Sequence, residues 1–349
     1  MPPKPGEPSR NPFLQFIVWL YDQTWFHWLI SFLAQPIYSL MGAFYRLQNV
    51  FWPINLWKDW QNRPEPKFAI PLTKTDLPVK TRLCDDCGNY IGTLIGTYVD
   101  VEQVKAILPP GTSLDPAHIH KNPLPPYEDQ HAIIMLFGYT EDLHFGWWPF
   151  RSMNYLECGV AVPHICIDDN VQYVERFFYI PVLHLNRFYP VLLGWMVGYR
   201  KKWSRVTTTF NTYTIKGLFT GKPILHAVFT PNKAELKENS EHWKELCEEP
   251  HLNQFGSDKL FLHFHWDWDD ALFESVDATV TLYEDFPGIK AGTYNFKGLD
   301  QGKWDDGRAP MGAVRLASPF ELLLPFSLSK LRAHTKEQKA SSPPAAPAK

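Results

Sequence analysis

The chain has 349 residues, which is enough for one large domain or two modest ones. Hydrophobic residues make up 45% of it and aromatic residues 15%, so a sizeable core can form. The formal net charge is -3, and this balance argues against nucleic acid as the main partner. Five cysteines, an odd and sparse set, argue against a secreted disulfide framework and favour a reducing, intracellular compartment.

The N-terminal part is predicted to fall into three segments. Residues 1–10 are polar and rich in proline, which predicts disorder. Residues 11–61 are apolar and rich in tryptophan, with no formal charge between Asp22 and Arg46. This pattern predicts two helices broken near Pro36. They either associate with a membrane interface through residues 11–60 or cover an apolar face of the main domain or of an oligomer. Residues 62–77, which hold several prolines, are predicted to form a linker.

Strand patterns dominate residues 78–330, where apolar and polar residues alternate between turn residues. A short helix is expected over residues 100–108 and a charged amphipathic helix over 233–249. Many strands with few helices predict a mainly β (α+β) fold built on a closed or sandwiched antiparallel sheet. Residues 331–349 are predicted to be a disordered tail. The expected strands are residues 90–98, 131–140, 159–167, 172–185, 206–216, 223–230, 259–268, 275–283, 292–297 and 311–317.

Lys201 and Lys202 form the pair with the clearest chemical meaning. They follow an uncharged run, residues 188–199, and precede a strand-like run, residues 206–214. Burial at the edge of an apolar region lowers the pKa of a lysine, and a second cation lowers it further. A lysine that is neutral near pH 7 can form a Schiff base with a ketone. The alternative is a surface cluster of basic residues that contacts anionic head groups.

The order of motifs along residues 80–327 resembles the acetoacetate decarboxylase superfamily. The segment Asp100 to Pro109 is similar to the first helix of that family, and Tyr155-Leu156-Glu157 is similar to its Tyr-x-Glu motif. The residues from Leu193 to Lys202 resemble the segment that ends in the family's lysine pair. The residues from Ala313 to Pro325 resemble its closing strand.

This resemblance implies a closed antiparallel β-barrel or cone-like domain with a few helices. It also implies a decarboxylase that acts on a β-keto acid without a metal or an organic cofactor. Lys201 would form the Schiff base, Lys202 would lower its pKa, and Glu157 would be a carboxylate of the pocket. The substrate-binding residues implied by the same motifs are Tyr155, Tyr199, Arg200 and Trp195.

Several positions depart from the family pattern. Leu193-Gly194-Trp195 stands where the family has Gly-Arg-Glu, and Arg200 replaces a proline. These changes remove charged groups, so the resemblance implies a larger and more hydrophobic keto acid. An aldolase or dehydratase that uses the same imine is a second interpretation. A non-catalytic protein that binds a lipophilic ligand or scaffolds a membrane complex is a third. A membrane surface and a second copy of the chain are the other expected partners.

Three further features have competing interpretations. His263, His265 and Asp267 share one face of a predicted strand and could hold a metal, although an inward aromatic face opposite a solvated polar face is favoured. His164 and His184 are expected to be hydrogen-bonded core residues. The lone C-x-x-C of residues 84–87 is interpreted as two ordinary thiols, since no second pair of ligands accompanies it.

Overall fold

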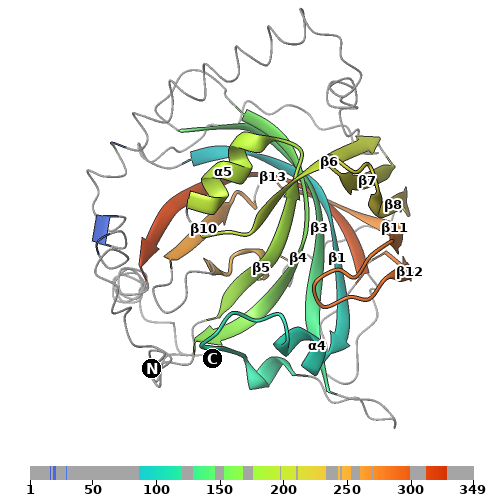
Figure 1. Ribbon diagram of the computed structural model, residues 1–349, viewed down its shortest axis with the longest axis horizontal. Helices are drawn as coiled ribbons and strands as arrows, with labels where there is room; N and C mark the ends of the chain where they lie inside the picture. The colour runs from blue at the N-terminus through green and yellow to red at the C-terminus, as the bar shows by residue number, and fades with distance from the viewer. Residues whose placement is uncertain are drawn as a thin grey trace, which may run out of the picture.

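The computed structural model describes residues 86–119, 129–145, 153–167, 176–196, 198–209, 211–232, 246–252, 260–268, 271–298 and 312–327, with Phe16, Trp19, Leu20, Leu29 and Trp243. Most of these residues belong to one hydrogen-bonded β-sheet system and to three short helices with defined bounds (Figure 1). The helices are α4 (Val101–Lys105), the 3-10 helix η1 (Pro116–His118) and α5 (Phe188–Met196). The strands are β1 (Asp86–Asp100), β2 (Thr112–Leu114), β3 (Gln130–Phe145), β4 (Met153–Ile167), β5 (Phe177–Leu185), β6 (Lys201–Thr209), β7 (Thr212–Gly217), β8 (Pro223–Pro231), β9 (His251–Leu252), β10 (Leu260–Trp266), β11 (Leu272–Leu282), β12 (Gly292–Phe296) and β13 (Gly312–Ser327).

Two closed rings of strands share one wall. The first ring runs through β13, β1, β3, β4, β5, β6, β7, β8 and β11, and closes where β11 pairs with β13. The second ring runs through β13, β1, β3, β4, β5, β9 and β10, and closes where β10 pairs with β13. The common wall is therefore β13, β1, β3, β4 and β5. The expectation of a mainly β fold with a closed barrel is confirmed.

The two end strands of the wall, β13 and β5, allow both rings to close. Each of them pairs along its outer edge with two different strands. Residues 314–317 of β13 pair with β11, whereas residues 320–327 pair with β10. In β5, residues 178–179 pair with β9 and residues 183–185 pair with β6. The two rings therefore separate at the middle of β13 and at the middle of β5.

The wall is apolar on both faces. In β3, Ile133, Met135 and Phe137 belong to the core of the first ring, whereas Ile134 and Leu136 belong to the core of the second. Every residue of β5 is buried. Strands covered on both sides have near-continuous hydrophobic sequences, and these strands follow that rule.

Two pairings between the named strands are parallel, which differs from the expected antiparallel barrel. β5 runs parallel to both β6 and β9. For β6 the reason lies in α5, which carries the chain back across the sheet before the next strand begins, as parallel neighbours require. The helix ends at Met196, and Gly198 then adopts a left-handed conformation with φ 83°. The Tyr199 amide donates to the Gly194 carbonyl at 2.8 Å, which closes the turn before β6.

Most other predicted elements are confirmed with shifted boundaries. The helix expected over residues 100–108 is α4, and its Asp100 side chain accepts from the amides of Glu102 and Gln103. The single run expected over 206–216 is two strands, β6 and β7, joined by a turn near residue 211. The strand expected at 311–317 extends to Ser327. The short strands β2 and β9 escaped prediction because they are too short to show a periodic pattern.

Several predictions lie outside the described residues. They concern the apolar segment 11–61 beyond its four described residues, the linker 62–77, most of the helix over 233–249, and both terminal tails. Within the part of the chain that the structure describes, no helix has the length and hydropathy needed to cross a membrane.

The glycines of the wall leave room for one aromatic ring. A Cβ atom built on Gly138 would lie 2.4 Å from the Tyr90 hydroxyl oxygen and 2.5 Å from the ring, and one on Gly92 would lie 2.7 Å from the same ring. We predict that Gly138→Ala destabilises the fold by about 1–3 kcal/mol, because the buried Tyr90 ring must leave its place. The urea unfolding midpoint measures this loss. A matched Tyr90→Leu background removes the clashing atoms, so equal losses in both backgrounds would contradict the prediction.

Candidate functional site

Lys201 begins β6 and its side chain is packed against α5. A Cβ atom on Gly194 would lie 2.2 Å from Cδ of Lys201 and 2.6 Å from Cε, so the aliphatic stem of the lysine crosses the bare backbone of that glycine. The Trp195 indole donates to the Lys201 carbonyl at 2.6 Å. The side chain is half-buried, and burial lowers the pKa of its ammonium group.

Glu157 lies in β4 and faces the interior of the second ring. Its neighbour two residues away, Tyr155, packs against the core of that ring, and alternate residues of a strand share a face. Burial raises the pKa of the Glu157 carboxyl to about 7, although the charge of Lys201 acts in the opposite direction. The carboxyl group can therefore hold or release a proton near neutral pH.

Strand β5 brings Glu157 and Lys201 together. Glu157 lies opposite Leu185 and Lys201 lies opposite Leu183, on either side of β5. Both leucines belong to the core of the second ring, so the two polar side chains face the same interior. The carboxylate raises the pKa of the lysine, and the ammonium lowers that of the carboxyl. The pair therefore combines an amine whose pKa is lowered with a carboxyl group whose pKa is about 7.

Lys202 does not act on Lys201 as expected. Adjacent residues of a strand point to opposite faces, and Lys202 is exposed. The causes of the Lys201 shift are burial, which is the larger, and Glu157. The charge of Lys202 instead lowers the pKa of His184, which burial already lowers, to about 4. Desolvation, rather than a neighbouring cation, therefore lowers the pKa of Lys201.

Of the four expected substrate-binding residues, Trp195, Tyr199 and Arg200 precede β6 directly, whereas Tyr155 lies in β4. Tyr155 is half-buried against the second core. Tyr199 is buried and donates its hydroxyl to the His251 carbonyl at 2.9 Å, so it anchors the turn. Arg200 is exposed, and its carbonyl accepts from the Leu183 amide. Trp195 is 52% exposed on the outside of α5.

Tyr90 is a member of the site that sequence reasoning missed. Its buried ring lies on Gly92 and Gly138 and makes an edge contact with Trp266, with ring centroids 5.6 Å apart. Gly138 pairs directly with Glu157, and opposite Cβ positions are about 5 Å apart, so the phenol lies close to the carboxyl. Burial and the charge of Glu157 raise the Tyr90 pKa, which keeps its hydroxyl protonated. The available sequence signal was the presence of Gly92 and Gly138 inside predicted strands, where a glycine often marks the close approach of another group.

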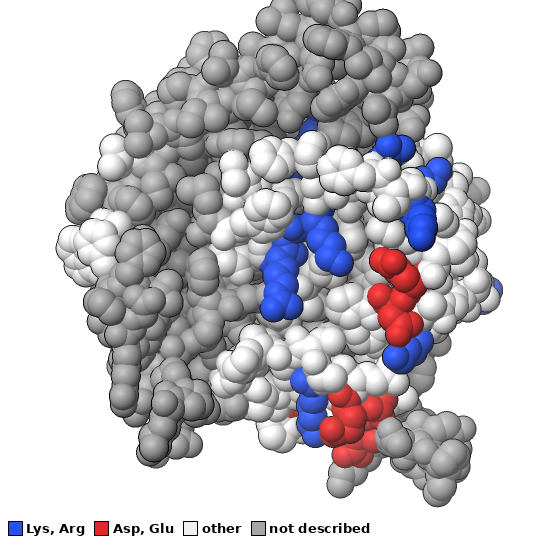
Figure 2. Space-filling model, viewed as in Figure 1, with Lys and Arg blue, Asp and Glu red and all other residues white. Residues whose placement is uncertain are grey.

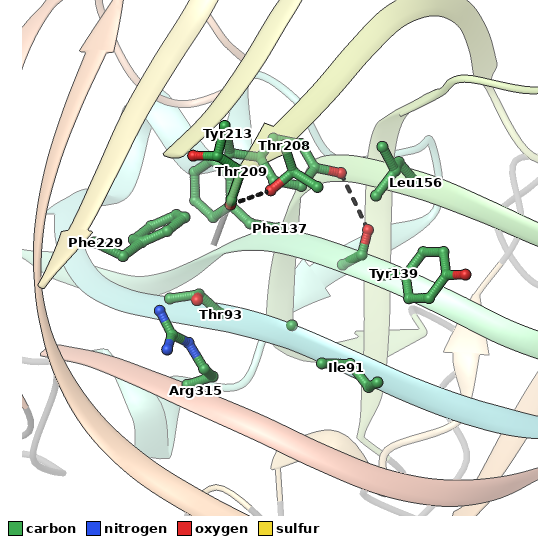
Figure 3. A pocket seen from close by; sticks show the side chains of 12 residues that line it. Ile91, Thr93, Phe137, Tyr139, Leu156, Thr208, Thr209, Tyr213, Phe229 and Arg315 are labelled. Carbon is green, nitrogen blue, oxygen red and sulfur yellow. Dashed lines mark hydrogen bonds between the residues drawn. The ribbon is translucent and has the colours of Figure 1, made fainter. Parts of the chain in front are cut away.

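A separate small cavity lies on the other side of the wall, inside the first ring (Figure 3). Leu156 lines it, and the adjacent Glu157 points the opposite way. Its volume is about 40 Å³, room for about three water molecules. Arg315, which donates to the buried Glu274 at 3.1 Å, lies at its edge with Thr93. The Tyr213 hydroxyl contacts the carbonyl oxygens of Gly138, at 3.1 Å, and of Glu157, at 2.6 Å.

The competing candidate sites contribute to packing and hydrogen bonding in the described part of the chain. Phe264, Trp266 and Trp268 pack against the core of the second ring, which confirms the inward aromatic face of β10. Among the described residues, no group of three or more His, Cys, Asp or Glu side chains is placed to hold a metal ion. His164 and His184 are hydrogen-bonded core residues as expected, His164 to Glu249 and His184 to the Ser204 hydroxyl.

Neither a family model nor a curated protein matches this sequence. Among solved structures, the chain is similar to acetoacetate decarboxylase from Legionella pneumophila, with 12% identity and a TM-score of 0.45 over 73% of this chain and 93% of that one. It is similar to an acetoacetate decarboxylase-like enzyme from Sphingomonas wittichii RW1, with 10% identity and a TM-score of 0.43 over 70% and 92%. It is also similar to the enduracididine biosynthesis enzyme MppR complexed with pyruvate, with 13% identity and a TM-score of 0.43 over 76% and 98%.

Two of these proteins carry the name of the superfamily that the order of motifs in this sequence resembles. The similarity concerns the fold alone, and the roles of Lys201 and Glu157 depend on their own surroundings in this chain. The chain is thus a closed β-barrel protein in which a half-buried lysine and a half-buried carboxyl group face the same interior.

The coupling between the pair gives a prediction with a definite sign. We expect Glu157→Gln to lower the pKa of Lys201 further, because the carboxylate stabilises the ammonium form. The pH dependence of Lys201 acetylation, followed by mass spectrometry, measures this pKa. Lys202, which is exposed and points to the other face of β6, serves as the internal control. An upward shift for Lys201, or an equal shift for both lysines, would contradict the assignment.

Proposed function

We propose that the protein is an imine-forming carbon–carbon lyase that decarboxylates a hydrophobic β-keto acid. The observation that carries the proposal is the half-buried Lys201 amine, whose pKa is lowered by burial, beside a carboxyl group whose pKa is about 7. A neutral amine is the nucleophile that imine formation needs, and an acid near its pKa at neutral pH can both give and take a proton.

The proposed steps use the pair as follows. The Lys201 amine attacks the ketone carbon, and the Glu157 acid protonates the departing hydroxyl group, so that water leaves and a protonated imine forms. The bond to the carboxylate then breaks, carbon dioxide leaves, and the electron pair moves into the iminium to give an enamine. The enamine carbon takes a proton, and water hydrolyses the resulting imine. The product ketone leaves and Lys201 is free again.

The surroundings of Lys201 support a hydrophobic substrate. The lysine faces the core of the second ring, to which Tyr90, Leu183 and Leu185 belong and against which Trp203 packs. Gly194 leaves its backbone bare beside the lysine stem. An apolar site favours loss of the charged carboxylate as neutral carbon dioxide, because desolvation destabilises the ionised reactant.

Trapping of the imine tests the proposal directly. The protein is incubated with β-keto acids of increasing chain length, borohydride is added, and adducts are mapped by mass spectrometry. We expect an adduct on Lys201 that is absent from Lys201→Met and retained in the matched variant Lys202→Met. Methionine preserves the stem that packs on Gly194, so the fold should survive.

The remaining outcomes separate the interpretations. An adduct without release of carbon dioxide would replace decarboxylation by aldol or dehydration chemistry through the same imine. A folded protein that gives no adduct with any ketone would contradict the imine and favour a non-catalytic protein that binds a lipophilic ligand. An adduct confined to Lys202 would also overturn the assignment.

Gly194 provides a second test that separates activity from stability. We predict that Gly194→Ala reduces the yield of the Lys201 adduct at least about tenfold, because the new methyl group displaces the lysine stem from beside Glu157. Stability should change little, since alanine favours a helix over glycine by about 1 kcal/mol and offsets part of the steric strain. Thermal unfolding provides the control. An unchanged yield would show that Lys201 works from another position.

A further inference from the structure

Tyr90 differs from Tyr199 and Tyr213, two other buried tyrosines, in the use of its hydroxyl group. The Tyr199 hydroxyl donates to the His251 carbonyl, and the Tyr213 hydroxyl donates to backbone carbonyls of β3 and β4. The Tyr90 side chain is 6% exposed, but no described residue is hydrogen-bonded to its hydroxyl. A buried phenol normally has a partner, so this hydroxyl indicates a ligand that supplies the acceptor.

The register of the wall places the Tyr90 hydroxyl beside Glu157. Gly92 pairs with Gly138, and Gly138 pairs with Glu157, so the three positions form one row across β1, β3 and β4. The Tyr90 ring lies over both glycines, with its hydroxyl over Gly138, one strand away from Glu157. Lys201 reaches the same interior from β6, beyond β5. Along the sheet, the phenol and the amine therefore lie on opposite sides of the carboxyl group.

Packing holds the phenol in this position before a ligand binds. The Tyr90 ring meets the Trp266 ring edge-on, with centroids 5.6 Å apart and an angle of 85° between the planes. The Trp266 indole in turn donates to the Cys247 carbonyl at 3.0 Å. Burial and the charge of Glu157 raise the pKa of the phenol, which keeps it a donor. A donor that is already oriented loses little conformational entropy on binding.

The order of these groups along the sheet matches the order of groups in a β-keto acid. In such an acid the carboxylate lies one carbon away from the ketone. A substrate joined to Lys201 through its ketone carbon can direct its carboxylate past Glu157 toward the phenol. The Glu157 carboxyl, with a pKa of about 7, is protonated for part of the time at neutral pH and then does not repel that carboxylate.

Cations are less well placed to hold the carboxylate inside the second ring. Figure 2 shows Lys and Arg side chains at the surface of the face that carries α5 in Figure 1. Arg200 and Lys202 are exposed, and ion pairs of exposed groups contribute little in water. The buried Arg315 lies on the other side of the wall, beside the cavity of the first ring, where it donates to Glu274.

We propose that the Tyr90 hydroxyl donates a hydrogen bond to the carboxylate of the substrate while Lys201 holds the ketone carbon. This inference rests on the proposed lyase activity and identifies the substrate as a free acid rather than an ester or a thioester. A neutral donor suits decarboxylation, because it orients the carboxylate but stabilises its charge less than an arginine does. Less binding energy is then lost when that charge moves into the iminium.

Tyr90→Phe tests the hydrogen bond, since it removes the hydroxyl and keeps the ring that packs on Gly92 and Gly138. The probes are 3-hydroxy acids of increasing chain length, which lack the ketone and cannot form an imine, and the matching 2-alkanols, which also lack the carboxylate. Calorimetric titration of the full chain measures their dissociation constants. We expect Tyr90→Phe to weaken binding of the hydroxy acids at least about tenfold, because a hydrogen bond to a charged group is lost, and to leave the 2-alkanols unchanged. The matched control is Tyr283→Phe, which removes a hydroxyl from a side chain that is 52% exposed.

Other outcomes would overturn the inference. They are an equal loss for both kinds of probe, which would assign Tyr90 a structural role, unchanged binding of the hydroxy acids, and absence of wild-type binding. A loss caused by Arg200→Gln and not by Tyr90→Phe would assign the carboxylate to the surface instead.

Imine trapping separates this inference from the lyase proposal. Lys201 adducts, together with hydroxy-acid binding that does not depend on Tyr90, would retain the lyase and remove the contact. Binding that depends on Tyr90, without any adduct on Lys201, would contradict the lyase and support a site for hydrophobic carboxylates.

Discussion

The wall of β13, β1, β3, β4 and β5 belongs to two closed rings, and the rest of the architecture depends on this double use. A sheet covered on both faces has no solvated side on which to place charged residues, so a polar group there must be paired or lose its charge. Glu157 shows the result, since burial moves its pKa to about 7. A carboxyl group with a pKa near neutral thus follows from the packing of the fold. Lys201 faces the same interior from β6, and burial lowers its pKa as well.

Glycines determine what fits beside this wall. Gly92 and Gly138 make room for the ring of Tyr90, and Gly194 makes room for the stem of Lys201. In each case the glycine has no side chain, so the larger side chain packs directly against the backbone. Contact with backbone restricts that side chain more than contact with a flexible side chain would. Gly198 has another function, because its positive φ turns the chain from α5 into β6 and so sets where Lys201 begins the strand. The site is therefore held by backbone as much as by side-chain contacts.

Much of this could be predicted from residues close together in sequence. Alternation marked most strands, the Asp100 cap marked α4, and the uncharged run before Lys201 correctly predicted that burial lowers its pKa. Pairings between distant segments could not be predicted, because period-two alternation does not say which strand is the neighbour. The division of β13 between β11 and β10 is such a case. The same limit hid the partnership of Tyr90 with Glu157 and led to Lys202 being assigned an effect that it exerts on His184.

The hydroxyl of Tyr213 reaches across the interior of the first ring to the backbone carbonyls of Gly138 in β3 and Glu157 in β4. The Glu157 side chain points to the opposite side of the wall. The interiors of the two rings are therefore linked through the backbone of β3 and β4. A substitution at Tyr213 alters a contact to the backbone carbonyl of Glu157 from the side of the wall opposite to its carboxyl group. We therefore expect substitutions among the residues of the small cavity to be correlated with substitutions near Glu157 and Lys201.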